Sequence, residues 1–315
     1  MDSQMLKERL AGAFVALITP FTAADDVDHV ALGRNAAWML ARGLDGILLL
    51  GSTGEQVHLS EFERALVLDV GRQHIPTDRV MIAGTGLSGT RQTIEETKQA
   101  GRAGADVALV VTPSYYQKAM NAANLTNHYR AVADASPIPI MLYSVPPIIN
   151  VTLPAEAVAA LVGHPNIIGM KNSGGDPQVA GLYREATVGH DFIILGGSAH
   201  AAPGFLLTGL VDGVILAAAN VLPEAAAALV QAARAGDIAA VRRAGELLRR
   251  VSETVGRHGI AGWKAGLAAR GQVGGPARLP LRNLNDSERQ QVATWTNELV
   301  AALKVRPGGR TASSP

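Results

Sequence analysis

The sequence predicts an α/β fold, a (β/α)8 (TIM) barrel, followed by a helical extension at the C-terminus. Three observations support this fold class. Eight short apolar runs occur in the first two-thirds of the 315-residue chain, segments with helical apolar spacing separate them, and only helical patterns follow Pro223. Eight βα units are the number that closes a parallel barrel. A doubly wound open sheet, which also alternates strands and helices, is the alternative.

Each expected strand is a short run rich in aliphatic residues, which is typical of parallel strands that are buried on both faces. The expected helices carry charged residues on one face. We expect strands at residues 13–19, 46–50, 80–83, 106–111, 138–143, 166–171, 192–195 and 213–216, and helices that include 30–41, 61–74, 91–103, 125–135 and 154–161.

Four further helical segments follow the eighth strand. The first, 224–235, is expected to be the last barrel helix. The other three, at 238–255, 260–269 and 287–303, are expected to form the extension. The chain is thus predicted to consist of a barrel over 1–236, a helical extension over 237–304 and a flexible tail over 305–315, where Pro-Gly-Gly-Arg and Ser-Ser-Pro occur.

The composition argues against several classes of function. A formal charge of +1 without a basic stripe argues against a nucleic-acid partner. The chain has 0 cysteines, which rules out disulfides and thiolate metal sites and is compatible with a reducing cytoplasm. Residues 1–10 are charged throughout, unlike a signal peptide, and the longest apolar stretch, 205–219, is short for a bilayer span and contains Asp212. Because that stretch is too short to cross a bilayer, we expect no membrane partner. The 8 histidines show no metal-ligand spacing, so we expect no metal.

Lys171 stands where the sixth apolar run ends, just before Asn-Ser-Gly-Gly-Asp, which is typical of a turn and a helix start. A buried ammonium is costly, and desolvation favours the neutral amine, which can attack a carbonyl. We therefore expect Lys171 to form a Schiff base with a keto acid. The alternative is a lysine whose head group reaches the surface from the strand end.

Active sites of such barrels lie at the C-terminal ends of the strands, so the residues after each run are candidates. A tyrosine hydrogen-bonded to a hydroxyl can relay protons, and backbone N–H groups with hydroxyls at a helix start can bind a carboxylate. Singly, Ser52 and Thr53 fit an ordinary helix cap and Tyr143 fits a core tyrosine; their joint placement favours an active site. The relevant strand ends are Gly-Ser-Thr-Gly-Glu at 51–55, Thr-Pro-Ser-Tyr-Tyr at 112–116, Tyr-Ser-Val-Pro at 143–146 and Gly-Gly-Ser at 196–198.

Together with Gly169-Met170-Lys171, these motifs resemble the dihydrodipicolinate synthase and N-acetylneuraminate lyase family of class I, pyruvate-dependent aldolases. The resemblance extends over residues 12–303. Within the family, the sequence is most similar to 4-hydroxy-2-oxoglutarate aldolase. That likeness lies in the stretches 111–116, 136–139, 143–146, 164–171, 173–176 and 274–281.

The resemblance implies a role for each candidate residue. Lys171 would be the Schiff-base lysine, Tyr143 the general acid/base, and Ser52 the link between Tyr143 and Tyr115. Thr53 would bind the pyruvoyl carboxylate. The resemblance implies no cofactor, and it implies a homotetramer built as a dimer of dimers, in which a phenol, that of Tyr116, packs across a subunit contact. The other implied substrate-binding residues are Ser173, Gly197 and Ser198, of which the two serines would face the distal part of the substrate.

One position departs from the family pattern. Dihydrodipicolinate synthases carry an arginine shortly after the Tyr-x-Val-Pro motif, where it binds a substrate carboxylate, whereas this chain has Ile148. An arginine can hold a carboxylate with two parallel hydrogen bonds and isoleucine cannot. The sequence therefore argues against dihydrodipicolinate synthesis and leaves a less polar aldehyde acceptor open.

We expect a lyase that cleaves or forms a C–C bond between pyruvate and an aldehyde, as 4-hydroxy-2-oxoglutarate aldolase does with glyoxylate. The alternatives are a 4-hydroxy-tetrahydrodipicolinate synthase-type enzyme, another 2-keto-3-deoxy sugar-acid aldolase or dehydratase, and a non-catalytic keto-acid sensor.

One further motif suggests a different function. Gly-Thr-Gly-Leu-Ser-Gly at 84–89 fits a dinucleotide-binding motif. The acidic partner of such a motif should end the next strand, but Asp106 begins it, so a rim loop is the preferred interpretation.

Overall fold

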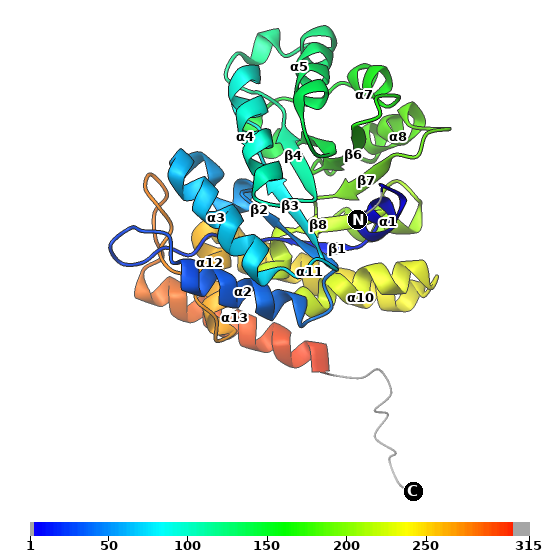
Figure 1. The fold of residues 1–315 in the computed structure, drawn as a ribbon. Coiled ribbons are helices and arrows are strands. Elements are labelled where there is room, and N and C mark those ends of the chain that lie inside the picture. The colour runs from blue at the N-terminus through cyan, green and yellow to red at the C-terminus, as the bar shows by residue number, and fades with distance from the viewer. Residues whose placement is uncertain (1–2, 305–315) are drawn as a thin grey trace, which may run out of the picture.

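Eight parallel strands close into a barrel in the computed structural model, which describes residues 3–304. Each strand pairs with its neighbours in sequence, and β8 returns to pair with β1, so the predicted (β/α)8 barrel is confirmed and the open sheet is wrong (Figure 1). The strand ends differ from the predicted ones by a few residues. The strands are β1 (Ala13–Ala16), β2 (Gly46–Leu49), β3 (Val80–Gly84), β4 (Val107–Val111), β5 (Ile140–Ser144), β6 (Ile167–Asn172), β7 (Ile193–Gly196) and β8 (Gly213–Leu216).

Helices cover the outside of the barrel, as the alternation of apolar runs and amphipathic segments predicts (Figure 1). Two starts agree with local signals in the sequence. Asp28 caps α2 by accepting a hydrogen bond from Ala31 N, and Asp176 caps α8 ahead of Pro177. The outer helices are α2 (His29–Leu40), α3 (Glu61–His74), α4 (Thr90–Arg102), α5 (Ala122–Ala135), α7 (Ala155–Leu161), α8 (Pro177–Ala186), α9 (Ala202–Leu207) and α10 (Pro223–Arg234).

A first helix, α1 (Ser3–Leu10), was not among the predicted elements. It is short and largely polar, but Leu6 and Leu10 are buried and join the core inside the barrel, where Phe14 and Met141 also lie. Because α1 leads directly into β1, it covers the N-terminal end of the barrel. The opposite end, where the strands finish, is left for the loops that carry the candidate residues.

Three C-terminal helices follow the barrel, as predicted: α11 (Ile238–Thr254), α12 (Gly259–Ala269) and α13 (Asp286–Lys304). Figure 1 shows them gathered on the side of the barrel that carries β1 and α2. Leu267 of α12 shares a buried core with Leu17 and Phe21, which lie in the loop after β1. The extension therefore packs against the C-terminal end of the barrel. The predicted flexible tail, 305–315, lies outside the described residues, and none of the described helices is long and apolar enough to cross a membrane.

Candidate active site

Lys171 is buried at the C-terminal end of β6, with a side chain that is 4% exposed. In the sheet it pairs directly with Tyr143 of β5, and its Nζ lies 4.4 Å from the centroid of the Tyr143 ring. The side chain therefore does not reach the surface from the strand end, so that alternative is wrong. An amine held away from water beside a phenol is the arrangement that Schiff-base chemistry requires.

Tyr143 is 4% exposed and contacts hydroxyl groups from two other loops. Ser173 Oγ donates a hydrogen bond to the Tyr143 hydroxyl at 3.4 Å, and the Ser52 side chain lies close enough to the phenol to lower its pKa. Burial alone would raise the pKa of Tyr143. The Lys171 charge, the Ser173 hydrogen bond and the nearby Lys171 and Ser52 side chains outweigh burial, so the pKa of Tyr143 lies below its ordinary value of 10.0. A phenol with a lowered pKa exchanges protons more readily near neutral pH.

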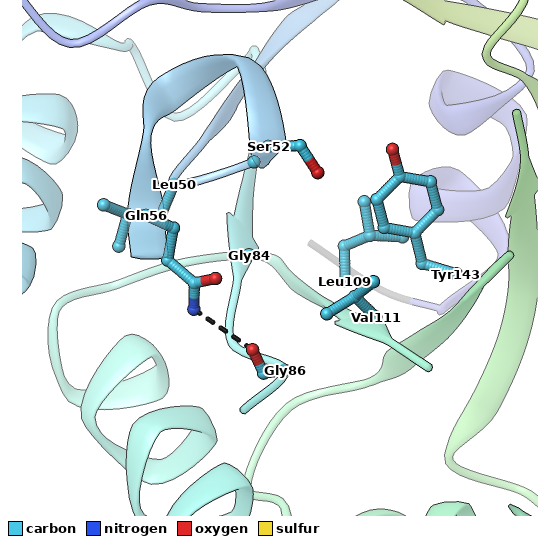
Figure 2. Close-up of a pocket in the computed structure, with 9 residues that line it drawn as sticks. Leu50, Ser52, Gln56, Gly84, Gly86, Leu109, Val111 and Tyr143 are labelled. Carbon is cyan, nitrogen blue, oxygen red and sulfur yellow. Dashed lines mark hydrogen bonds between the residues drawn. The ribbon is translucent and has the colours of Figure 1, made fainter. Parts of the chain in front are cut away.

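Ser52 and Thr53 belong to η1 (Ser52–Gly54), a single turn that starts just after β2. Figure 2 shows the Ser52 hydroxyl directed towards the Tyr143 hydroxyl across a small cavity of about 20 Å³. That volume is close to the space that one water molecule occupies. Thr53 follows in the same turn and is half-buried.

Gly197 completes the surroundings of the lysine. A Cβ at this position would lie 1.9 Å from Ser173 Oγ and 3.0 Å from Lys171 Cε, so only glycine fits without displacing both. The Gly197 N–H donates to Asn172 O at 2.7 Å, which ties the loop after β7 to the end of β6. Ser198 is half-buried, and its Oγ accepts a hydrogen bond from Ala201 N at 3.4 Å. Gly197 and Ser173 thus lie at the amine, and Ser198 stands one residue further along the rim.

Within one chain, Tyr115 does not hydrogen-bond to Ser52 or Tyr143. Its side chain is 79% exposed, and its ring packs edge-to-face on Tyr116 at a centroid distance of 5.0 Å. Among the hydrogen bonds and ring contacts of residues 3–304, none joins Tyr115 to Ser52 or Tyr143. The loop after β4 directs both phenols outwards, because residues 113–116 extend beyond the strand end before the chain turns into α5.

A larger cavity of about 370 Å³ opens beside Ser52 on the same rim. Its walls are mainly apolar, and Ile148, which is 64% exposed, stands at its edge. Of the described residues, no lysine or arginine lines this cavity. Much of the apolar wall is formed by Val57, Val111, Ile148, Ile149, Ile260 and Leu281.

The glycine-rich segment at 84–89 starts with the last residue of β3 and continues as a loop on the rim, the interpretation preferred above. A Cβ on Gly84 would lie 2.0 Å from Leu50 O, and a Cβ on Gly86 would lie 2.4 Å from Val111 N. Gly86 O also accepts a hydrogen bond from Gln56 Nε2 at 3.3 Å (Figure 2). The two glycines therefore allow neighbouring backbones to approach, which is reason enough for their presence without a dinucleotide.

The sequence reasoning missed one buried ion pair next to the site. Lys264 Nζ of α12 lies 2.6 Å from Glu55 Oε1, and both side chains are 1% exposed. Glu55 directly follows the turn that carries Ser52. A lysine within an otherwise apolar and small-residue helix, 260–269, was the signal in the sequence, although its partner could not be known from sequence spacing.

Comparisons with known proteins show which family the chain belongs to. A family model described as the Dihydrodipicolinate synthetase family matches residues 9–299. The probable mitochondrial 4-hydroxy-2-oxoglutarate aldolase of Emericella nidulans is 34% identical over 275 residues, covering 85% of this chain and 88% of that protein. The 4-hydroxy-tetrahydrodipicolinate synthase of Methanosarcina barkeri is 34% identical over 295 residues, covering 91% and 98%.

Solved structures give the same result. YagE, a prophage protein from E. coli K12 crystallised with pyruvate, matches with a TM-score of 0.86 and 27% identity, covering 92% of this chain and 98% of that one. The dihydrodipicolinate synthase of Acinetobacter baumannii, also in complex with pyruvate, matches with a TM-score of 0.85 and 29% identity, covering 92% and 98%. A barrel with these strand-end motifs and these relatives identifies the chain as a member of the dihydrodipicolinate synthetase family.

Proposed function

We propose that this protein is a class I aldolase in which Lys171 forms a Schiff base with a 2-oxo acid. The observation that carries the proposal is the buried Lys171 amine beside the Tyr143 ring, at 4.4 Å from its centroid, with Ser173 hydrogen-bonded to the phenol and the Ser52 hydroxyl directed towards it. Membership of a family of pyruvate-dependent lyases and aldolases supports the same chemistry.

In the first stage the Lys171 amine attacks C2 of a 4-hydroxy-2-oxo acid. Proton transfers through Tyr143 convert the C2 oxygen into water, which leaves, and a protonated imine remains on Lys171. Ser52 and Ser173 hold the phenol in place while it gives and takes protons. Thr53, in the same turn as Ser52, is assigned to the carboxylate of the 2-oxo acid.

In the second stage the protonated imine accepts electrons. The phenolate of Tyr143 removes the proton of the C4 hydroxyl, the C3–C4 bond breaks, and its electron pair forms the enamine of pyruvate on Lys171. An aldehyde leaves. Protonation of the enamine at C3 and addition of water to the imine then release pyruvate and restore the free amine. Gly197 leaves room for the ligand at Lys171, and Ser173 and Ser198 are assigned to its distal part.

For the substrate we propose 4-hydroxy-2-oxoglutarate, which would give pyruvate and glyoxylate. The name of the Emericella nidulans relative and the sequence motifs shared with such aldolases support this choice. The second candidate is a 4-hydroxy-tetrahydrodipicolinate synthase-type reaction, which the Methanosarcina barkeri relative favours. Ile148 weighs against the second candidate, because the arginine that binds a substrate carboxylate in such synthases is missing; it gives no support to glyoxylate, which also carries a carboxylate.

The test is reduction with borohydride in the presence of pyruvate, followed by mass mapping of the peptides. We expect one adduct, on Lys171, in the wild type and none in Lys171→Met, which keeps the length of the side chain but has no amine. An adduct on another lysine, or none at all, would remove the mechanism. Turnover of a panel of 2-oxo acid aldols then separates the candidate substrates, and binding of pyruvate without any turnover would favour a sensor.

We also propose a cytoplasmic homotetramer, arranged as a dimer of dimers. The exposed pair Tyr115 and Tyr116 supports a subunit contact at the rim, since two adjacent phenols that are 79% and 72% exposed form an unusual surface for an isolated domain. Sedimentation of the wild type and of a Tyr115→Ser/Tyr116→Ser variant tests the contact. A monomeric wild type would contradict it.

A further inference from the structure

The buried pair Lys264–Glu55 joins the C-terminal extension to the turn that carries Ser52. Both side chains are 1% exposed, and Lys264 Nζ lies 2.6 Å from Glu55 Oε1. Neither residue belongs to the group around Lys171 and Tyr143. A buried ion pair is often no more stabilising than apolar side chains of similar size, so its presence calls for an explanation other than stability.

Both members of the pair have further partners that fix the position of each side chain. Lys264 Nζ donates a hydrogen bond to Pro276 O at 2.6 Å and lies 4.2 Å from the centroid of the Phe21 ring. The second carboxylate oxygen of Glu55 accepts a hydrogen bond from Arg278 N at 3.0 Å and lies 3.3 Å from His58 Nδ1. Glu55 is therefore held from two points of the C-terminal segment at once.

The backbone at Glu55 needs such support. Glu55 has φ +57°, and Leu50, on the other side of the turn, has φ +56°. Both are left-handed conformations that non-glycine residues rarely adopt, and they persist only when surrounding contacts hold them. The two residues bracket the segment 51–54, so the direction of the Ser52 side chain depends on both conformations.

We propose that Lys264 is a positioning residue: through Glu55 it holds the turn at 51–54 so that the Ser52 hydroxyl stays directed at the Tyr143 hydroxyl. The C-terminal extension is then part of the machinery of proton transfer and does not only cover the barrel. The inference rests on the proposed Schiff-base function, because Tyr143 transfers protons only if a Schiff base forms and breaks down at Lys171. It goes beyond that function by assigning a role to a helix outside the barrel.

The experiment measures deuterium exchange into the methyl group of pyruvate in D₂O by NMR. This exchange requires the Schiff base and its proton transfers, and it needs no knowledge of the aldehyde. We expect Lys264→Met to slow exchange about 10- to 100-fold, a part of what general acid–base catalysis contributes, while borohydride still traps pyruvate on Lys171. Lys264→Arg, which keeps the charge, should recover most of the rate.

A double-mutant cycle of Lys264→Met and Ser52→Ala separates an effect on the position of Ser52 from general destabilisation of the protein. If Lys264 acts through Ser52, Lys264→Met should slow exchange far less in the Ser52→Ala background than in the wild type. The matched control is Arg270→Met, which breaks another ion pair of the C-terminal segment, Arg270 Nη2 to Glu224 Oε1 at 2.6 Å, away from the turn. That control should exchange at nearly the wild-type rate.

Each outcome is decisive. Equal slowing by Lys264→Met in both backgrounds, or wild-type exchange in Lys264→Met, overturns the positioning role and leaves the aldolase proposal standing. A wild type that neither traps pyruvate nor exchanges deuterium overturns both. If Lys264→Met does not fold, Glu55→Gln takes its place in the same cycle, and wild-type exchange in Glu55→Gln overturns the role equally.

Discussion

Gly197 lies against Lys171 so closely that a single methyl group on its Cα would be 3.0 Å from Cε of the lysine. The same methyl group would be 1.9 Å from Ser173 Oγ. The absence of a side chain at Gly197 therefore sets the free space at the amine, and the loop after β7 contributes to the site through its backbone.

Gly197→Ala should slow formation of the pyruvate adduct on Lys171. The methyl group would displace Ser173 and the lysine side chain, and we expect borohydride trapping of pyruvate to slow about 100-fold, the effect of a displacement of about 1 Å at a reacting group. The control is Gly181→Ala in α8, where a Cβ would meet nothing within 4 Å and alanine should stabilise the helix by about 0.5–1 kcal/mol. Trapping at the wild-type rate in Gly197→Ala would contradict this account of the free space.

Tyr143→Phe should separate imine formation from proton transfer. The ring and its packing remain, but the hydroxyl that Ser173 and Ser52 contact is lost. We expect turnover to fall about 10²- to 10⁴-fold, whereas pyruvate is still trapped on Lys171. Comparison of steady-state turnover with the yield of the trapped adduct measures this difference. Equal losses in both quantities would show that the phenol is needed to form the imine as well.

Ser173→Ala should raise the pKa of Tyr143. The Ser173 hydrogen bond stabilises the phenolate, and its loss removes one of the contacts that lower this pKa against the effect of burial. The high-pH limb of kcat that reports this phenol should therefore move to higher pH in the variant. Ser198→Ala is the control, because among the described residues its hydroxyl hydrogen-bonds to Ala201 N and not to Tyr143. A limb that moves to lower pH would contradict the prediction.

His128 should make the protein less stable at mildly acidic pH. Burial lowers the pKa of His128 from 6.5 to about 4, so the unfolded chain binds more protons between these values. Stability from the neutral imidazole is thus complete above pH 6.5 and declines as the pH falls towards 4. We expect the wild type to lose about 1–2 kcal/mol more than His128→Gln between pH 7 and 5, measured as free energy of unfolding. Identical losses in the two proteins would refute the prediction.

Ile148→Arg should shift substrate preference towards anionic aldehydes. Ile148 is 64% exposed at the edge of the apolar cavity, so the substitution should change stability by less than about 0.5 kcal/mol. A hydrogen bond to a charged group is worth about 1.5–3 kcal/mol, and we expect the ratio of kcat/KM for glyoxylate over a neutral aldehyde of similar size to rise about tenfold or more. Ile148→Gln, polar but uncharged, should leave the ratio nearly unchanged.

Local patterns in the sequence determined the barrel and the position of its amine. Alternating apolar runs and amphipathic segments predict eight βα units, and a lysine at the end of a strand lies at the rim of any barrel those units form. The same reasoning placed Tyr143 next to Lys171, because sequential strands of such a barrel are neighbours in the sheet. These conclusions need only short-range periodicity and the closure of eight strands.

The tertiary structure alone decided which distant side chains meet. No local pattern relates Lys264 to Glu55, because the two residues are far apart in the sequence and become neighbours only when the C-terminal extension packs on the rim of the barrel. The outward direction of Tyr115 likewise depends on how the loop after β4 turns, which its sequence leaves open. The physical reason is that strand order and periodicity are properties of short segments, whereas a buried contact between loops depends on the packing of the whole chain.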